Sequence, residues 1–208
     1  MVKVKANDPL GILMAEHETI QCVLDGLEAA ARAVRAGSGP EPGLLAEMIW
    51  FLREYADGRH HAKEEEMLFP ALEFNGIPAR QGPTATMRAE HAKGRLLTGC
   101  MHACLQGDGP KAQSARNDFA GAAEAYLALL RAHIQKEDHC LFAVGASLLG
   151  FIEKKQLAAA FKRIDADWES RQGPRIRARI KALLRACQAM AENALPVPGP
   201  RREVPACA

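Results

Sequence analysis

The sequence has few aromatic residues and no long apolar run. Aromatic side chains make up 5% of the 208 residues, and no stretch shows the alternation of Val, Ile, Thr and Tyr that is typical of strands. Ala, Leu, Glu, Arg and Lys are abundant, which favours helices. No segment contains the roughly 18 consecutive apolar residues of a membrane-spanning helix. The composition therefore predicts an all-α protein without a membrane partner.

Several familiar functional motifs are also absent. The N-terminal stretch MVKVKANDPL lacks the apolar core and the small-residue cleavage site of a secretory signal, so we expect a cytoplasmic protein. The sequence contains no nucleophile motif, no Gly-rich phosphate loop and no zinc-finger spacing. It also lacks a helix-turn-helix pattern with interleaved aromatics, so a nucleic-acid partner is not expected.

Turn-forming residues divide the chain into helical stretches. The breaks NDPLG, GSGPEPG, NGIP and GDGP separate four long stretches, at about residues 11–36, 44–74, 84–106 and 111–149. Four helices of this length with short connections predict an antiparallel up-down-up-down four-helix bundle over residues 8–149. We expect a basic helical extension over residues 150–194, and the Pro-rich residues 195–208 to be disordered.

The charge distribution sets the C-terminal extension apart. Residues 1–149 carry 15 Lys and Arg against 19 Asp and Glu, whereas residues 150–208 carry 12 against 6. After a short helical stretch and a break at RQGP (171–174), one stripe of a basic amphipathic helix carries the apolar residues Ile176, Ile180, Leu184 and Cys187. We expect this stripe to dock on the acidic bundle or on a second subunit, which would give a homodimer through the C-terminal helices.

An internal repeat links the second and fourth helical stretches. HHAKEEEMLF (60–69) matches HIQKEDHCLF (133–142) at an offset of 73, so that His60, Lys63 and Glu64 align with His133, Lys136 and Glu137. The second and fourth helices of an up-down-up-down bundle are parallel and diagonally opposed. Both copies of the repeat are therefore expected to face one point in the core.

The repeated residues have the spacing of metal ligands. A His and a Glu four residues apart lie on one face of a helix, and imidazole and carboxylate together suit first-row transition metals. The other two helices each offer one histidine on an apolar face, His17 and His91. A lone histidine on such a face is usually a hydrogen-bonded core residue. Four helices that each present one predict a shared metal site, because separate burial would leave several polar groups unsatisfied.

At these residues the sequence resembles the hemerythrin-like family, the HHE cation-binding domains that hold a non-heme diiron centre in a four-helix bundle. The resemblance covers about residues 8–149 and implies a two-iron cofactor, with Mn or Zn as substitutes, and Glu64 and Glu137 as the bridging carboxylates. Its implied ligands are His17, His60, Glu64, His91, His133 and Glu137. The chain has Arg95 where oxygen-carrying hemerythrins have a second third-helix histidine, and Glu137 competes with Asp138 at the last carboxylate position. Fewer histidines imply more open coordination.

Two alternatives stay open at the site. His61 and Glu65 have the same spacing as His60 and Glu64; the repeat favours the latter pair, with His61 outside the ligand set or exposed. Tyr126 lies two turns before His133 on the same face, so its hydroxyl either approaches the metal centre or lies at the bundle boundary.

The resemblance implies a protein that reacts with or senses dioxygen, peroxide or nitric oxide in an oxidative or nitrosative stress response. As an enzyme it would be a diiron oxidoreductase of the peroxidase, catalase or nitric-oxide-handling kind. The alternative is a reversible oxygen or iron binder, or a sensor, without catalytic turnover. A metal-free helical scaffold is the remaining reading, and it requires buried carboxylates without a cation.

Overall fold

The computed structural model describes residues 8–106 and 110–194, and all of its regular structure there is helical, which confirms the all-α prediction. The elements before the extension are α1 (Pro9–Arg35), α2 (Pro42–Phe51), η1 (Leu52–His61), η2 (Glu64–Leu68), α3 (Phe69–Phe74), α4 (Pro83–Cys104), α5 (Gln113–Lys136), η3 (Glu137–Leu141) and α6 (Phe142–Leu148). The extension consists of α7 (Phe151–Gln172) and α8 (Ile176–Asn193).

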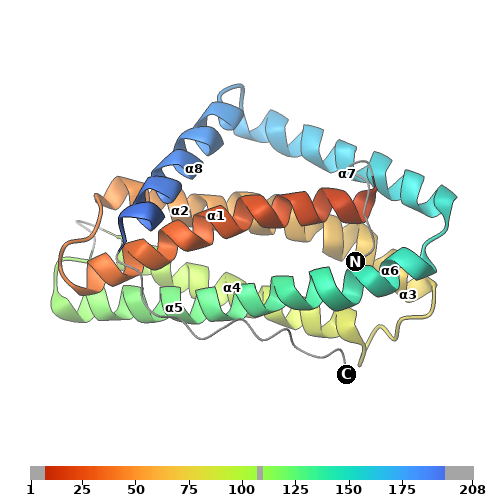
Figure 1. Cartoon of the computed structure of the whole chain (residues 1–208), viewed down its shortest axis with the longest axis horizontal. Coiled ribbons are helices and arrows are strands. Elements are labelled where there is room, and N and C mark those ends of the chain that lie inside the picture. The colour runs from red at the N-terminus through yellow and green to blue at the C-terminus, as the bar shows by residue number, and fades with distance from the viewer. Residues whose placement is uncertain (1–7, 107–109, 195–208) are drawn as a thin grey trace.

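The helices begin where the sequence provides starting signals. Asp8 caps α1 by accepting a hydrogen bond from the Leu10 N–H at 3.1 Å, and Pro9 occupies the first helical position. α2 and α4 likewise begin at prolines, Pro42 and Pro83. α2, η1, η2 and α3 make up the second predicted stretch, while α5, η3 and α6 make up the fourth (Figure 1).

The two stretches that carry the repeat change their helical winding at equivalent places. Glu64–Leu68 and Glu137–Leu141 are π-helical, and these two segments are offset by the same 73 residues as the repeat. Leu52–His61 is π-helical as well. Hydrogen bonds from i to i+5 put more residues into each turn, so neighbouring side chains diverge less around the axis than in an α-helix. Two successive residues can therefore face the same side.

Two apolar clusters fill the interior. One is built on the C-terminal half of α1 together with α2 and α5, and includes Ile20, Phe51 and Phe119. The other is built on the start of α1 with α3 and α6, and includes Leu13 and Phe69. His17 lies on α1 between Leu13 and Ile20, so the predicted site residues occupy the polar layer between the two clusters.

The extension packs on the α1 and α2 side of the molecule, away from α4 and α5 (Figure 1). α7 has 22 residues and is longer than the short stretch expected. Ile176 and Cys187 on α8 are buried, and the close approach of α8 to α1 depends on Gly26, because a Cβ there would lie 2.5 Å from the Cβ of Cys187. The apolar stripe of α8 therefore docks on the bundle.

No helix within the described residues is long and apolar enough to cross a membrane. The predicted disordered segment, residues 195–208, lies outside the described residues.

Candidate metal centre

Seven buried His and Glu side chains from four helical stretches meet between the apolar clusters. They form two overlapping groups, and within each group one potential ligand atom per residue lies within 4.8 Å of the others. The first group is His17, His60, Glu64 and Glu137, and the second is His61, Glu64, His91 and His133. All six residues predicted from the sequence are brought together, and His61 joins them.

The two glutamates lie where the groups meet. Glu64 belongs to both groups, with its oxygens 3.6 Å from Nε2 of His60 and 3.5 Å from Nε2 of His91. Oε2 of Glu137 is 3.3 Å from Nε2 of His17 and 3.3 Å from Nε2 of His133. Each carboxylate therefore touches histidines of both groups.

Both glutamates lack the partners that a buried carboxylate needs. Glu64 and Glu137 are fully buried, and none of their four side-chain oxygens has a hydrogen-bond partner. A buried, unpaired carboxylate costs several kcal/mol, roughly, unless a cation compensates it. Two metal ions shared by these carboxylates would satisfy all four oxygens, so the residues present fit a dinuclear site.

Each of the five histidines is held at its other ring nitrogen by a second carboxylate. The Nδ1 contacts are His17 to Asp138 at 2.7 Å, His60 to Glu16 at 3.0 Å, His61 to Asp57 at 3.1 Å, His91 to Glu65 at 2.7 Å and His133 to Glu90 at 2.8 Å. This carboxylate–histidine arrangement fixes the ring, leaves Nε2 as the ligand atom and raises its basicity, as at protein metal sites in general.

The sequence analysis missed this outer ring of carboxylates, although one signal for it was present. The triplet Ala-Glu-His occurs at 15–17 and again at 89–91. In both copies the glutamate holds a histidine of the neighbouring stretch, Glu16 for His60 and Glu90 for His133. The first and third helices therefore repeat as the second and fourth do, which gives the centre an approximate two-fold symmetry.

The charges around the centre favour protonation of two histidines and of Glu64 when no metal is bound. Burial alone would lower the pKa of His17, but the hydrogen bond to Asp138 and the neighbouring Glu137 raise it to about 10. The pKa of His133 is likewise raised to about 10 against the effect of burial, chiefly by Glu137. Burial, reinforced by the charge of Glu137, raises the pKa of Glu64 well above 4.5. Metal ions would replace these protons as the compensating charge.

His61 departs from the sequence-based prediction. It was expected outside the ligand set or exposed, whereas its side chain is buried and its ring stacks on His91 with the ring centroids 3.7 Å apart. The π-helical winding of Leu52–His61 explains how successive histidines both reach the interior. With His61, five histidines surround the two glutamates.

The structure also explains the two positions that the sequence analysis marked as unusual, Arg95 and Asp138. Arg95 donates hydrogen bonds to Asp57 and Glu65 at 2.8–3.0 Å, the carboxylates that hold His61 and His91. Asp138 lies behind His17, on the side away from Glu137. Glu137 rather than Asp138 therefore faces both histidine groups.

A small cavity adjoins the second group. It has a volume of about 10 Å³, which is close to the space that one water molecule needs. Its lining includes His61, His91, Gly94, Thr98 and the buried ring of Tyr126. Tyr126 therefore lies buried beside the cavity.

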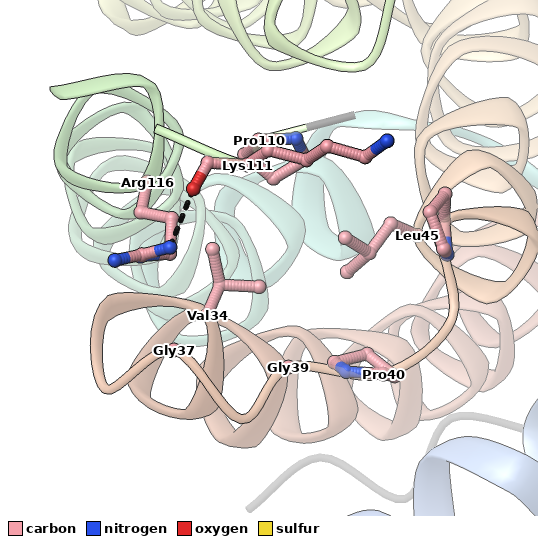
Figure 2. Close-up of a pocket in the computed structure, with 9 residues that line it drawn as sticks. Val34, Gly37, Gly39, Pro40, Leu45, Pro110, Lys111 and Arg116 are labelled. Carbon is pink, nitrogen blue, oxygen red and sulfur yellow. Dashed lines mark hydrogen bonds between the residues drawn. The ribbon is translucent and has the colours of Figure 1, made fainter. Parts of the chain in front are cut away.

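A larger surface pocket lies elsewhere, at the end of α1 and the start of α5. It has a volume of about 340 Å³, and Figure 2 shows its lining by the loop after α1 and by Pro110, Lys111 and Arg116. None of the nine residues that line it is a histidine, a cysteine or an acidic residue. It is therefore separate from the candidate metal centre.

Comparisons with known proteins agree with the geometry. The family model described as the hemerythrin HHE cation binding domain matches residues 8–144. An uncharacterised protein of Mycobacterium bovis and one of Mycobacterium tuberculosis are each 26% identical to the chain over 150 residues, which is 72% of this chain. The match spans 58% of the length of these relatives. No solved structure matches the chain.

Proposed function

Because the chain belongs to the hemerythrin HHE cation-binding family, we propose that its buried centre holds two iron ions and reacts with or senses dioxygen, peroxide or nitric oxide. The observation that carries the proposal is the pair of fully buried glutamates, Glu64 and Glu137, which lie between two groups of histidines. None of their four side-chain oxygens has a hydrogen-bond partner. The setting is an antiparallel up-down-up-down bundle whose second and fourth helices supply both glutamates.

The ligands divide into two sets in this proposal. His61, His91 and His133 would hold one ion, and His17 and His60 would hold the other. Glu64 and Glu137 would be shared by both ions, because each lies close to histidines of both groups.

The donor set suits iron, and it also suits Mn or Zn. A bound iron pair would supply two-electron redox chemistry towards an O–O or N–O ligand. The protein itself would orient the imidazoles through their Nδ1 carboxylates and exclude bulk water with the apolar cluster on either side. The cavity of about 10 Å³ beside Tyr126 has room for about one water-sized molecule, which favours a small ligand.

A function in oxidative or nitrosative stress follows from this ligand class. Catalytic turnover is one form of it. The second form is reversible binding or sensing without turnover. In that form the extension would respond to the centre through Asp165, which pairs with Lys63 and Arg59, the two cations that also pair with Glu16. Steady consumption of peroxide or nitric oxide with an electron donor would identify an enzyme.

The test is the metal content of untagged protein purified without oxygen. We expect about two iron ions per chain, and loss of both from the double variant Glu64→Gln/Glu137→Gln. The control Glu66→Gln changes an exposed glutamate of the same segment and should keep the full metal content. A wild-type chain that stays empty after reconstitution with ferrous iron would refute the proposal.

A further inference from the structure

The approximate symmetry of the centre breaks at one lysine. Lys63 and Lys136 are equivalent in the repeat, and each pairs with the glutamate that holds a histidine, Glu16 and Glu90 respectively. The side chain of Lys136 is 34% exposed, whereas that of Lys63 is completely buried. The two halves of the centre therefore have different surroundings although their ligands match.

Helix α7 accounts for the different surroundings of the two lysines. Oδ1 of Asp165 lies 2.6 Å from Nζ of Lys63 and 2.7 Å from Nε of Arg59. Arg59 also pairs with Glu16, at 3.0 Å from Nη2 to Oε1, and the ring of Phe161 lies 5.9 Å from Nζ of Lys63. The cations Lys63 and Arg59 are thus shared between two carboxylates, Glu16 of α1 and Asp165 of the extension.

This sharing sets how strongly Glu16 can hold His60. With Asp165 present, the charges of Lys63 and Arg59 are balanced by two carboxylates. Without it, both cations would draw on Glu16 alone, and the buried group would carry an uncompensated positive charge. The Glu16 carboxylate would then become a poorer acceptor for Nδ1 of His60, which it contacts at 3.0 Å.

We propose that Asp165 is a positioning residue for the half of the centre that contains His17 and His60, and that through it the C-terminal extension acts on one metal ion and not on the other. The proposal rests on the proposed function for its metal. The contact between Glu16 and the His60 ring is present without metal and can be tested by itself. A displacement of α7 would be transmitted to His60 through Lys63, Arg59 and Glu16.

The experiment compares four variants of the full chain, of which Asp165→Glu keeps the charge and serves as the rescue variant. Asp165→Asn removes the charge at nearly constant shape. Asp167→Asn is the matched control, since it makes the same change on α7 at a side chain that is 70% exposed and pairs only on the surface with Arg171 at 3.0 Å. Glu90→Gln removes the equivalent support from His133.

The first measurement is the release of metal to a chelator from the loaded protein. Outer carboxylates of this kind typically change metal affinity by about 10- to 100-fold. We expect Asp165→Asn to speed the release of one ion about tenfold and leave the other unchanged, Glu90→Gln to affect the other ion, and Asp167→Asn to match wild type. Equal acceleration of both ions by Asp165→Asn, or of neither, would overturn the proposal.

The second measurement uses metal-free protein, so that it remains decisive if the chain binds no metal. Nitrogen-15 NMR of the histidine rings reports which nitrogen carries the proton. In Asp165→Asn the ring signals of His60 should shift while those of His133 stay in place, and Asp165→Glu should restore them. A change spread over both rings would assign Asp165 a general structural role instead, and an unchanged His60 ring would remove the proposed coupling.

Discussion

Replacement of Glu64 by glutamine should have opposite effects on the metal-free and the metal-loaded protein. In the metal-free protein Glu64 is fully buried, its oxygens lack hydrogen-bond partners, and burial together with the charge of Glu137 raises its pKa well above 4.5. A neutral amide of the same shape removes that unfavourable charge. In the metal-loaded protein the same change would remove a carboxylate that we propose both ions share.

The structure bounds the size of the first effect. Glu64 can escape its unfavourable charge by taking up a proton. The cost of burying it at pH 7 is therefore limited to the free energy of protonating an ordinary carboxyl group at that pH. Because pH 7 lies 2.5 units above the ordinary pKa of 4.5, this free energy is about 3.4 kcal/mol. The buried amide keeps part of the desolvation cost. We therefore expect a gain of about 2 kcal/mol for metal-free Glu64→Gln, which raises Tm by about 4–8 °C for a chain of this size.

The pH dependence has a definite sign. A carboxyl group whose pKa is higher in the folded than in the unfolded protein binds more protons when folded, so its contribution to stability falls as the pH rises above the unfolded value. The stability gain of metal-free Glu64→Gln over wild type should therefore grow from pH 4.5 towards pH 7 and vanish near pH 4.5.

Metal binding reverses the order. A tenfold loss of affinity at each of two ions corresponds to about 2.8 kcal/mol in total, and bound metal stabilises the folded state through this affinity. Thermal unfolding with and without metal measures both effects on the same variant. The reasoning would be refuted if the metal-free Glu64→Gln variant were less stable than metal-free wild type. It would also be refuted if the variant gained as much stability from metal as wild type does.

Two further predictions concern glycines. Gly94→Ala should fill the cavity beside the histidines, since its Cβ would meet only the Tyr126 ring, at an ordinary 3.5 Å. We expect ligand binding, measured by stopped flow, to slow about tenfold, which corresponds to about 1.4 kcal/mol. The control Gly99→Ala lies on the same helix with nothing within 4 Å of its Cβ, and it should leave the rate unchanged. Gly26→Ala should lower the free energy of unfolding by about 1–3 kcal/mol, because its Cβ would overlap Cys187. Equal stability of Gly26→Ala and wild type in a denaturant titration would contradict the docking of α8.

The sequence alone determined the helical class, the starting points of helices and most of the candidate site. Helix starts are local, since Asp8, Pro42 and Pro83 act on their own turns. The repeat of His60 and Glu64 by His133 and Glu137 was visible because a metal site constrains residue type and spacing along each helix. These properties depend on neighbours within a few positions, which a sequence displays directly.

Only the tertiary structure decided the place of His61 and the identity of the outer carboxylates. A helical wheel assumes constant α-helical winding, and the π-helical segment at Leu52–His61 breaks that assumption. The carboxylate partners of His60 and Lys63 come from α1 and α7, 44 and 102 residues away in sequence. Side chains so far apart in the chain meet only after the helices pack, because the contacts depend on the relative placement of whole helices.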